Sequence, residues 1–148
     1  MFTIKKKRLI APSVYLMDVE APKIARKRKA GQFVILRVNE EGERFPLTIA
    51  DSDPVAGTIT IIFQTAGKST TMLAALNEGD AIRDVVGPLG LPTHVEKVGH
   101  VVCIGGGVGI APVYPILRAM KEAGNRVTSI ISSRSKNLLI LEEEMRRH

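Results

Sequence analysis

The sequence predicts a β + α/β protein in which a six-stranded antiparallel barrel is followed by an incomplete, Rossmann-like α/β domain. First, apolar residues before Gly87 mostly alternate with polar ones or form short β-branched runs, which is the pattern of strands. Second, turn-forming residues separate six such runs, and six short strands in so little chain favour a closed barrel. Third, strands begin to alternate with helical segments after Pro92, as in doubly wound sheets.

The expected barrel strands follow one another with short breaks. They are Phe2–Leu9, Val14–Glu20, Gln32–Val38, Phe45–Ala50, Thr58–Thr65 and Ala81–Val86. Clusters of Gly, Pro, Asn and Asp stand between them, as turns require. One helix is expected among the strands, over Ser69–Leu76, because Met72, Leu73 and Leu76 lie at helical spacing behind hydroxyl residues that can cap it.

The segment after Pro92 has the pattern strand, helix, strand, helix. The expected strands are Val101–Ile104 and Arg126–Ser132, and the expected helices are Pro112–Ala123 and Asn137–Arg147. This is about half of a doubly wound domain, whose parallel sheet is usually covered on both faces and rarely stops at two strands. We therefore expect a barrel domain over residues 1–92 and the N-terminal part of an α/β domain over residues 99–148.

Composition excludes several classes of protein. The chain has 148 residues, of which 45% are apolar and 24% charged, unlike a collagen, a coiled coil or a disordered tail. The single cysteine, Cys103, allows no internal disulfide and no cysteine-ligated cluster, and a reducing, cytoplasmic setting fits best. The longest uncharged stretch, Val101–Leu117, is broken by glycine and proline and is too short to span a membrane. The histidines share no metal-ligand spacing, so no metal site is expected.

The most informative motif is a glycine cluster between an expected strand and an expected helix. It comprises Gly105, Gly106, Gly107, Gly109, Ala111 and Pro112. Free backbone N–H groups and the positive end of the helix dipole meet there, which suits a diphosphate, and glycine lets the backbone approach it. The spacing departs from the usual dinucleotide fingerprint, because Gly109 lies two positions after Gly107 and not three. A tight turn without a ligand is the alternative.

Two further stretches carry basic and hydroxyl side chains. Glu43–Thr48 holds Arg44, which can clamp a phosphate, and Thr48, whose hydroxyl can contact the edge of a cofactor ring. A solvated charge at a strand end is the alternative for Arg44. Thr65–Thr71 places a glycine and then hydroxyls at a helix start, which indicates a phosphate loop or ordinary capping. It lacks the first glycine of the Walker motif, so ATP hydrolysis is not supported.

In this order the motifs resemble those of the ferredoxin–NADP reductase family, over the whole chain. Gly31–Phe33 is similar to the family's entry to a barrel strand, Phe45–Thr48 to its Arg-Pro-Tyr-Ser flavin motif, and Gly67–Thr70 to its second flavin-phosphate loop. Gly87–Gly90 resembles the interdomain motif and Gly105–Pro112 the pyridine-nucleotide loop. The resemblance is closest to the branch of electron-transfer subunits, such as those of dihydroorotate dehydrogenase and of ferredoxin-dependent NADP reductase of the sulfide dehydrogenase type.

The resemblance implies a flavoprotein oxidoreductase that passes electrons between NAD(P)H, FAD and an iron–sulfur partner. FAD would contact Arg44, Phe45, Pro46, Leu47, Thr48, Gly67, Lys68, Ser69 and Thr70, with Thr48 in the catalytic position near flavin N5. NADP(H) or NAD(H) would contact Gly105, Gly106, Gly107, Gly109, Ala111, Pro112 and Arg134. Arg134 follows the second strand of the tail, where an arginine favours a 2′-phosphate and hence NADP. A solvated loop charge is the alternative for Arg134.

The chain departs from the family pattern in three places. Phe45 stands where the family has its phosphate-clamping arginine, and Arg44 lies one position earlier, on the opposite face of a strand. Leu47 replaces the aromatic residue that stacks on the flavin. Members of this branch also continue into a fuller nucleotide domain and a cysteine cluster for [2Fe–2S]. We therefore expect an incomplete, inactive N-terminal part that does not itself bind the cluster and that works with a larger catalytic or iron–sulfur subunit.

Two other functions stay open at this point. The net charge of +6 and the basic runs Lys5–Arg8 and Arg26–Lys29 would suit a nucleic-acid backbone. The chain has no Trp, two Tyr and four Phe to stack on bases and no recognition motif, so no nucleic-acid partner is expected. The other function is that of a regulatory subunit that keeps this fold but binds no cofactor.

Overall fold

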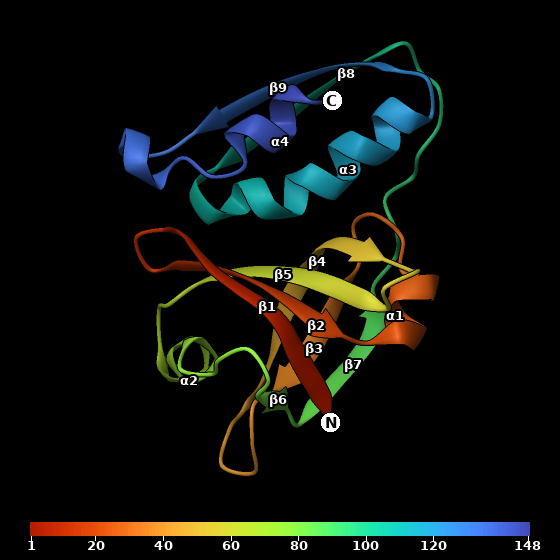
Figure 1. Cartoon of the computed structure of the whole chain (residues 1–148). Coiled ribbons are helices and arrows are strands. Elements are labelled where there is room, and N and C mark those ends of the chain that lie inside the picture. The colour runs from red at the N-terminus through yellow and green to blue at the C-terminus, as the bar shows by residue number, and fades with distance from the viewer.

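One seven-stranded antiparallel sheet forms the barrel in a computed structural model that describes the whole chain, residues 1–148 (Figure 1). Its strands are β1 (Phe2–Ala11), β2 (Val14–Glu20), β3 (Phe33–Arg37), β4 (Arg44–Asp53), β5 (Thr58–Gln64), β6 (Ala81–Ile82) and β7 (Asp84–Leu89). Their order is β6-β1-β2-β5-β4-β3-β7. Every neighbouring pair is antiparallel, which confirms the predicted kind of sheet.

The predicted count of six strands is wrong, because the expected strand Ala81–Val86 is divided in two. Residues before Arg83 pair with β1 at one edge of the sheet, and residues after it pair with β3 at the other edge. A single straight strand cannot pair with both edges, so the chain bends at Arg83, whose N–H donates to the Val38 carbonyl at 3.1 Å. This one segment nearly closes the sheet into a barrel.

Two short helices flank the barrel, α1 (Pro22–Lys27) and α2 (Lys68–Ala74) (Figure 1). The helix α1 was not predicted from the sequence, because Pro22 indicates a break. A proline is nevertheless favourable in the first turn of a helix, and here it occupies that turn while Ile24 and Ala25 are buried. The other helix, α2, is the one expected over Ser69–Leu76, displaced by one or two residues at its ends.

A second sheet contains two parallel strands, β8 (His100–Gly106) and β9 (Arg126–Ser132). The 3₁₀ turn η1 (Gly107–Gly109) and the helix α3 (Ile110–Glu122) connect them. The predicted strand–helix–strand unit is therefore confirmed.

The predicted helix Asn137–Arg147 is wrong in its first half. The chain there forms a 3₁₀ turn, η2 (Lys136–Leu138), and only α4 (Glu142–Arg146) is an α-helix. Leu141 takes a φ of 57° between them. Ile140 is 2% exposed and lies in an apolar core against the barrel, so its burial outweighs the local helical pattern.

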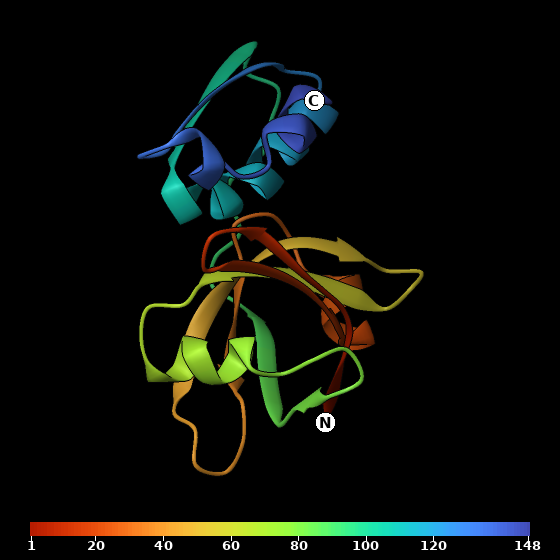
Figure 2. The same ribbon diagram turned by 60° about the vertical axis from the view of Figure 1, so that its left-hand side comes forward.

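The apolar core has two clusters. One lies inside the barrel and includes Met17, Leu36 and Phe63. The other lies between the barrel and the helices above it (Figure 2). The barrel supplies Ala11, Val14, Leu16, Ala50 and Ile62 to this second core, and the later segment supplies Cys103, Ile110, Ala111, Tyr114, Leu117, Ile140 and Met145. The two sheets thus share a core, and the division into domains over 1–92 and 99–148 stays a prediction.

The outer face of the second sheet is apolar and exposed. Val102, Ile104 and Ile130 are 51%, 69% and 52% exposed, whereas Cys103 faces the shared core. Helices cover one side of β8 and β9 (Figure 2). The parallel strand pair is therefore packed on one face.

Candidate functional site

The glycine cluster forms the connection from β8 to α3. A Cβ on Gly105 would lie 3.0 Å from Ile110 Cα and 3.4 Å from the Gly109 carbonyl oxygen, so only glycine allows the strand to approach the helix this closely. Gly107 has a φ of +56°, a left-handed conformation that glycine adopts without strain. A Cβ on Gly107 or Gly109 would meet nothing within 4 Å, and no side chain caps α3. The turn therefore presents open space beside an uncapped helix start.

A pocket of about 300 Å³ brings the glycine turn together with Arg134. Its lining residues are Val14, Gln64, Gly107, Val108, Ser133, Arg134 and Leu138. Gln64 ends β5, so the barrel forms one wall of this pocket. Gly107 and Arg134 were both predicted to contact the nucleotide, and they line one pocket. The contribution of Val14 and Gln64 was not predicted, because it depends on how the two sheets pack.

The stretch around Thr48 has two faces, because side chains alternate along a strand. Phe45 and Leu47 pack against the core of the barrel and are partly buried. Arg44 and Pro46 are exposed, on the same face as Thr48. Arg44 Nη1 lies 3.6 Å from Asp84 Oδ2, and the Arg44 side chain is 56% exposed. Arg44 and Thr48 therefore lie on the outer face of β4, whereas Phe45 and Leu47 lie on the face toward the barrel core.

The predicted flavin-phosphate loop, Gly67–Thr70, lies at the N-terminus of α2. Gly67 precedes the helix, a Cβ there would meet nothing within 4 Å, and no side chain caps the N-terminus. The Thr70 hydroxyl accepts from the Ala66 N–H at 2.9 Å and donates to the Gly67 carbonyl at 3.3 Å. Lys68 is exposed and Ser69 is half-buried. Thr70 thus shapes the turn, while Lys68, Ser69 and the first backbone N–H groups stay open to a ligand.

The β4 and α2 stretches lie at one end of the barrel. β4 and β5 are antiparallel, and the last pair that they form at this end is Ile49 with Ile61. Thr48 therefore lies on the side from which the chain leaves β5 toward Ser69. Gln64, at the end of β5, also reaches the glycine pocket, so all three predicted motifs gather around this end of the sheet.

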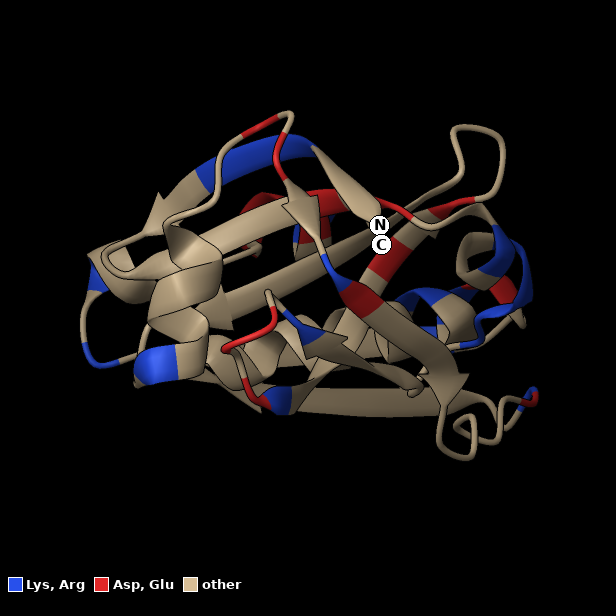
Figure 3. Cartoon of the chain, turned by 90° about the horizontal axis from the view of Figure 1, so that it is seen from below, with Lys and Arg blue, Asp and Glu red and all other residues tan.

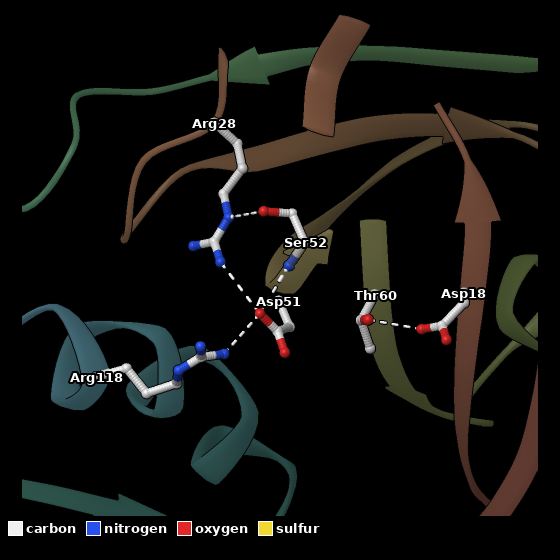
Figure 4. A network of polar contacts seen from close by, with 6 residues as sticks. All are labelled: Asp18, Arg28, Asp51, Ser52, Thr60 and Arg118. Carbon is white, nitrogen blue, oxygen red and sulfur yellow. Dashed lines mark hydrogen bonds and ion pairs between the residues drawn. The ribbon is translucent and has the colours of Figure 1, made fainter. Parts of the chain in front are cut away.

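A polar network that was not predicted from the sequence joins the barrel to α3 (Figure 4). Asp51 Oδ1 accepts from Arg118 Nη1 at 2.7 Å and lies 3.4 Å from Arg28 Nη2. Arg28 Nε donates to the Ser52 hydroxyl at 2.7 Å. Burial lowers the pKa of Arg28, and Asp51 opposes that change. Residues so far apart in the chain give no local signal of this contact.

The basic runs are partly used within the protein. Lys5 pairs with Glu20 at 2.9 Å, and Lys7 Nζ donates to the Ala74 carbonyl at 2.5 Å. Figure 3 shows the basic band on β1 and the basic segment around α1 on different parts of the molecule. No group of three His, Cys, Asp or Glu residues has the arrangement of a metal site, and no helix has the length and hydropathy of a membrane span.

Comparison with known proteins shows what the chain is similar to. No protein-family model matches the chain. A Thermotoga maritima protein named as a homolog of the electron transfer subunit of dihydroorotate dehydrogenase B (NAD(+)) is 45% identical over 143 residues, covering 97% of this chain and 51% of the relative. A solved NADH-dependent reduced ferredoxin-NADP oxidoreductase superimposes with a TM-score of 0.94 at 44% identity, over 98% of this chain and 52% of that one. Over nearly its whole length the chain is therefore similar to electron-transfer proteins of the ferredoxin–NADP reductase kind, the resemblance that its motifs indicated.

More distant proteins with the same fold bear out this architecture. Phthalate dioxygenase reductase has a TM-score of 0.77 at 18% identity over 97% of this chain and 46% of that one. The likeness at this identity concerns the fold alone. The chain spans about half the length of the curated relatives it matches.

Proposed function

We propose that the chain is the FAD-binding and nucleotide-entry part of a flavoprotein oxidoreductase, which passes electrons between NAD(P)H, FAD and an iron–sulfur partner. The observation that carries the proposal is the gathering of three motifs at one end of the barrel: Thr48 on β4, the Gly67–Thr70 turn, and the pocket at Gly107. The 45% identity to a protein named for electron transfer supports it.

The residues at this end of the barrel fit FAD. The uncapped start of α2 offers backbone N–H groups, with the Lys68 ammonium beside them, to the cofactor's phosphates. Arg44 is on the outer face of β4 and could add a cation if it left Asp84. Thr48 supplies a hydroxyl for the flavin edge. Bound FAD would accept a hydride and release single electrons, and the chain's own residues would hold and orient it.

The pocket at Gly107 fits a nicotinamide nucleotide. Gly107 and Gly109 leave room for a diphosphate, since no Cβ fills the space beside the turn. Arg134 and Ser133 line the same pocket, and an arginine with a hydroxyl suits a 2′-phosphate better than a free ribose hydroxyl. We therefore propose NADP(H) in preference to NAD(H).

The proposed partners follow from the relatives and from the exposed sheet. The relatives named as electron-transfer subunits support a larger catalytic or iron–sulfur subunit as partner, and the single, unpaired Cys103 suits the reducing cytoplasm. The apolar outer face formed by Val102, Ile104 and Ile130 offers a surface for such a partner, because parallel sheets are normally packed on both faces. The chain by itself has no cysteine set for [2Fe–2S].

Flavin binding and nucleotide preference can be tested on the purified native-length protein. We expect added FAD to remain bound through gel filtration, with the visible absorbance of oxidised flavin, and NADPH to bleach it. Arg134→Ala should lower the preference for NADPH over NADH about tenfold or more, since a charge-assisted hydrogen bond contributes about 1.5–3 kcal/mol. Arg126→Ala, at the other end of β9, is the matched control and should leave the preference unchanged.

Two results would contradict the proposal. A protein that takes up no FAD would favour the cofactor-free regulatory subunit. Retention of a nucleic-acid duplex at moderate salt, lost on neutralising Arg26 and Lys27, would favour the nucleic-acid-binding alternative.

A further inference from the structure

The Asp51 network joins the two elements that carry the proposed cofactor contacts. Asp51 lies on β4, three residues after Thr48, and Arg118 lies on α3, which starts directly after the glycine turn. Arg118–Asp51 is the one ion pair in the structure that links α3 to the barrel. Each of the other ion pairs joins two residues before Pro92 or two residues after it.

The barrel holds the Asp51 carboxylate in place from its own side. A register shift in the β4–β5 pairing occurs between Ile49 and Asp51, and such bulges redirect a side chain. Asp51 Oδ1 accepts from the Ser52 N–H at 2.8 Å and lies 3.4 Å from Arg28 Nη2. Arg28 in turn donates to the Ser52 hydroxyl at 2.7 Å. The acceptor for Arg118 is therefore held by contacts within the barrel that do not involve α3.

Arg118 is equally constrained on α3. Its guanidinium lies 5.6 Å from the centre of the Tyr114 ring, one helical turn away. Its Nη1 donates to Asp51 at 2.7 Å, and its Nε is buried without a hydrogen-bond partner. Losing Asp51 would leave this partly buried cation without its carboxylate.

We propose that Asp51 is a positioning residue that fixes α3 on β4 and thereby sets the approach of the nucleotide to the flavin. The shared apolar core favours contact but is non-directional, whereas a hydrogen-bonded ion pair at 2.7 Å fixes one register. Hydride transfer depends on that register, because a 1 Å misplacement can cost about a hundredfold in rate. The consequence for rate rests on the proposed function, but the geometric role does not.

The geometric role can be measured without any cofactor. Spin labels at Val55→Cys, 98% exposed on the barrel, and at Arg126→Cys, exposed at the start of β9, report the distance between the two parts. We expect Asp51→Asn to broaden the distance distribution. Glu20→Gln is the matched control, because it removes an ion pair of similar length, 2.9 Å, within the barrel. Equal distributions in the two variants would overturn the proposal.

The consequence for rate is measured by stopped-flow reduction of the FAD-loaded native-length protein. We expect Asp51→Asn to slow flavin reduction by about tenfold or more, with unchanged FAD affinity and KM for NADPH. Arg118→Met should behave alike, and Arg118→Lys should recover part of the rate. Should Asp51→Asn fail to fold, Arg118→Met gives the same comparison.

The two proposals fail in different ways. Failure of every protein, including the wild type, to bind FAD would refute the proposed function and leave the distance measurement valid. Normal FAD binding with an unchanged rate in Asp51→Asn would refute the positioning role alone.

Discussion

Three glycines of one turn are expected to respond to alanine in three different ways. At Gly105 the new methyl would lie 3.0 Å from Ile110 Cα, an atom of the backbone that cannot rotate away. Overpacking of this kind costs about 1–3 kcal/mol. At Gly107 the space is open but φ is +56°, which costs an alanine roughly 1–2 kcal/mol. At Gly109 the space is open and φ is −64°, so alanine should stabilise by about 0.4–1 kcal/mol through the unfolded state.

Thermal unfolding and nucleotide titration together separate these effects. A destabilisation of about 2 kcal/mol lowers Tm by roughly 4–8 °C in a protein of this size, so Gly105→Ala should melt earliest and Gly109→Ala no earlier than wild type. Gly107→Ala and Gly109→Ala both place a methyl in the proposed diphosphate space, and both should weaken NADPH binding, as should the larger Gly107→Val, which should spare flavin. If Gly109→Ala bound NADPH as tightly as wild type, the diphosphate would not lie against this turn.

Other predictions concern the shared core, pH and completeness of the site. Leu117→Ala, at a side chain 1% exposed between the sheets, should cost about 2–5 kcal/mol and keep one cooperative urea transition; two separate transitions would contradict a shared core. Burial raises the pKa of Cys103 and of Tyr114. The two raised pKa values stabilise the folded state fully below the unfolded-state pKa of each group, and this stabilisation is lost as pH rises through the folded-state pKa. The urea concentration at the unfolding midpoint should therefore decrease as pH is raised from about 8 to about 11, and a midpoint independent of pH would refute this expectation. Residues 1–148 should hold FAD but be reduced by NADPH more slowly than the Thermotoga maritima relative, of which the chain matches about half, and equal rates would show that residues 99–148 suffice.

The sequence predicted those parts of the fold that depend on local pattern. Strand alternation located the barrel strands, and the glycine cluster before Pro112 indicated the turn into α3. Alternation along β4 also anticipated that Arg44 and Phe45 point to opposite faces. These features depend on residues close together in the chain, so a single sequence contains the information.

Features set by long-range packing could not be predicted in this way. The bend at Arg83 arises because one segment pairs with both edges of the sheet. The segment around Ile140 loses its helix to burial against the barrel. In the same way Asp51 meets Arg118 and Gln64 meets Gly107 only once the two sheets pack. Part of the candidate site, and all of its proposed positioning network, thus depends on tertiary structure.

The core between the sheets limits how this barrel can be used as an independent module. A chain shortened to end at Pro92 would expose to water the apolar side chains that the barrel contributes to the shared core, and exposed patches of this kind promote aggregation. These side chains are Ala11, Val14, Leu16, Ala50 and Ile62. A designer who wants the barrel alone would have to replace the larger of these with polar residues. Insertions between His94 and Val95 should instead be tolerated, because the chain there forms no helix or strand and the backbone contacts of the segment lie at Thr93, Glu96 and Val98. Recombination of the two halves by gene fusion therefore depends on matching surfaces, whatever the length of the connecting segment.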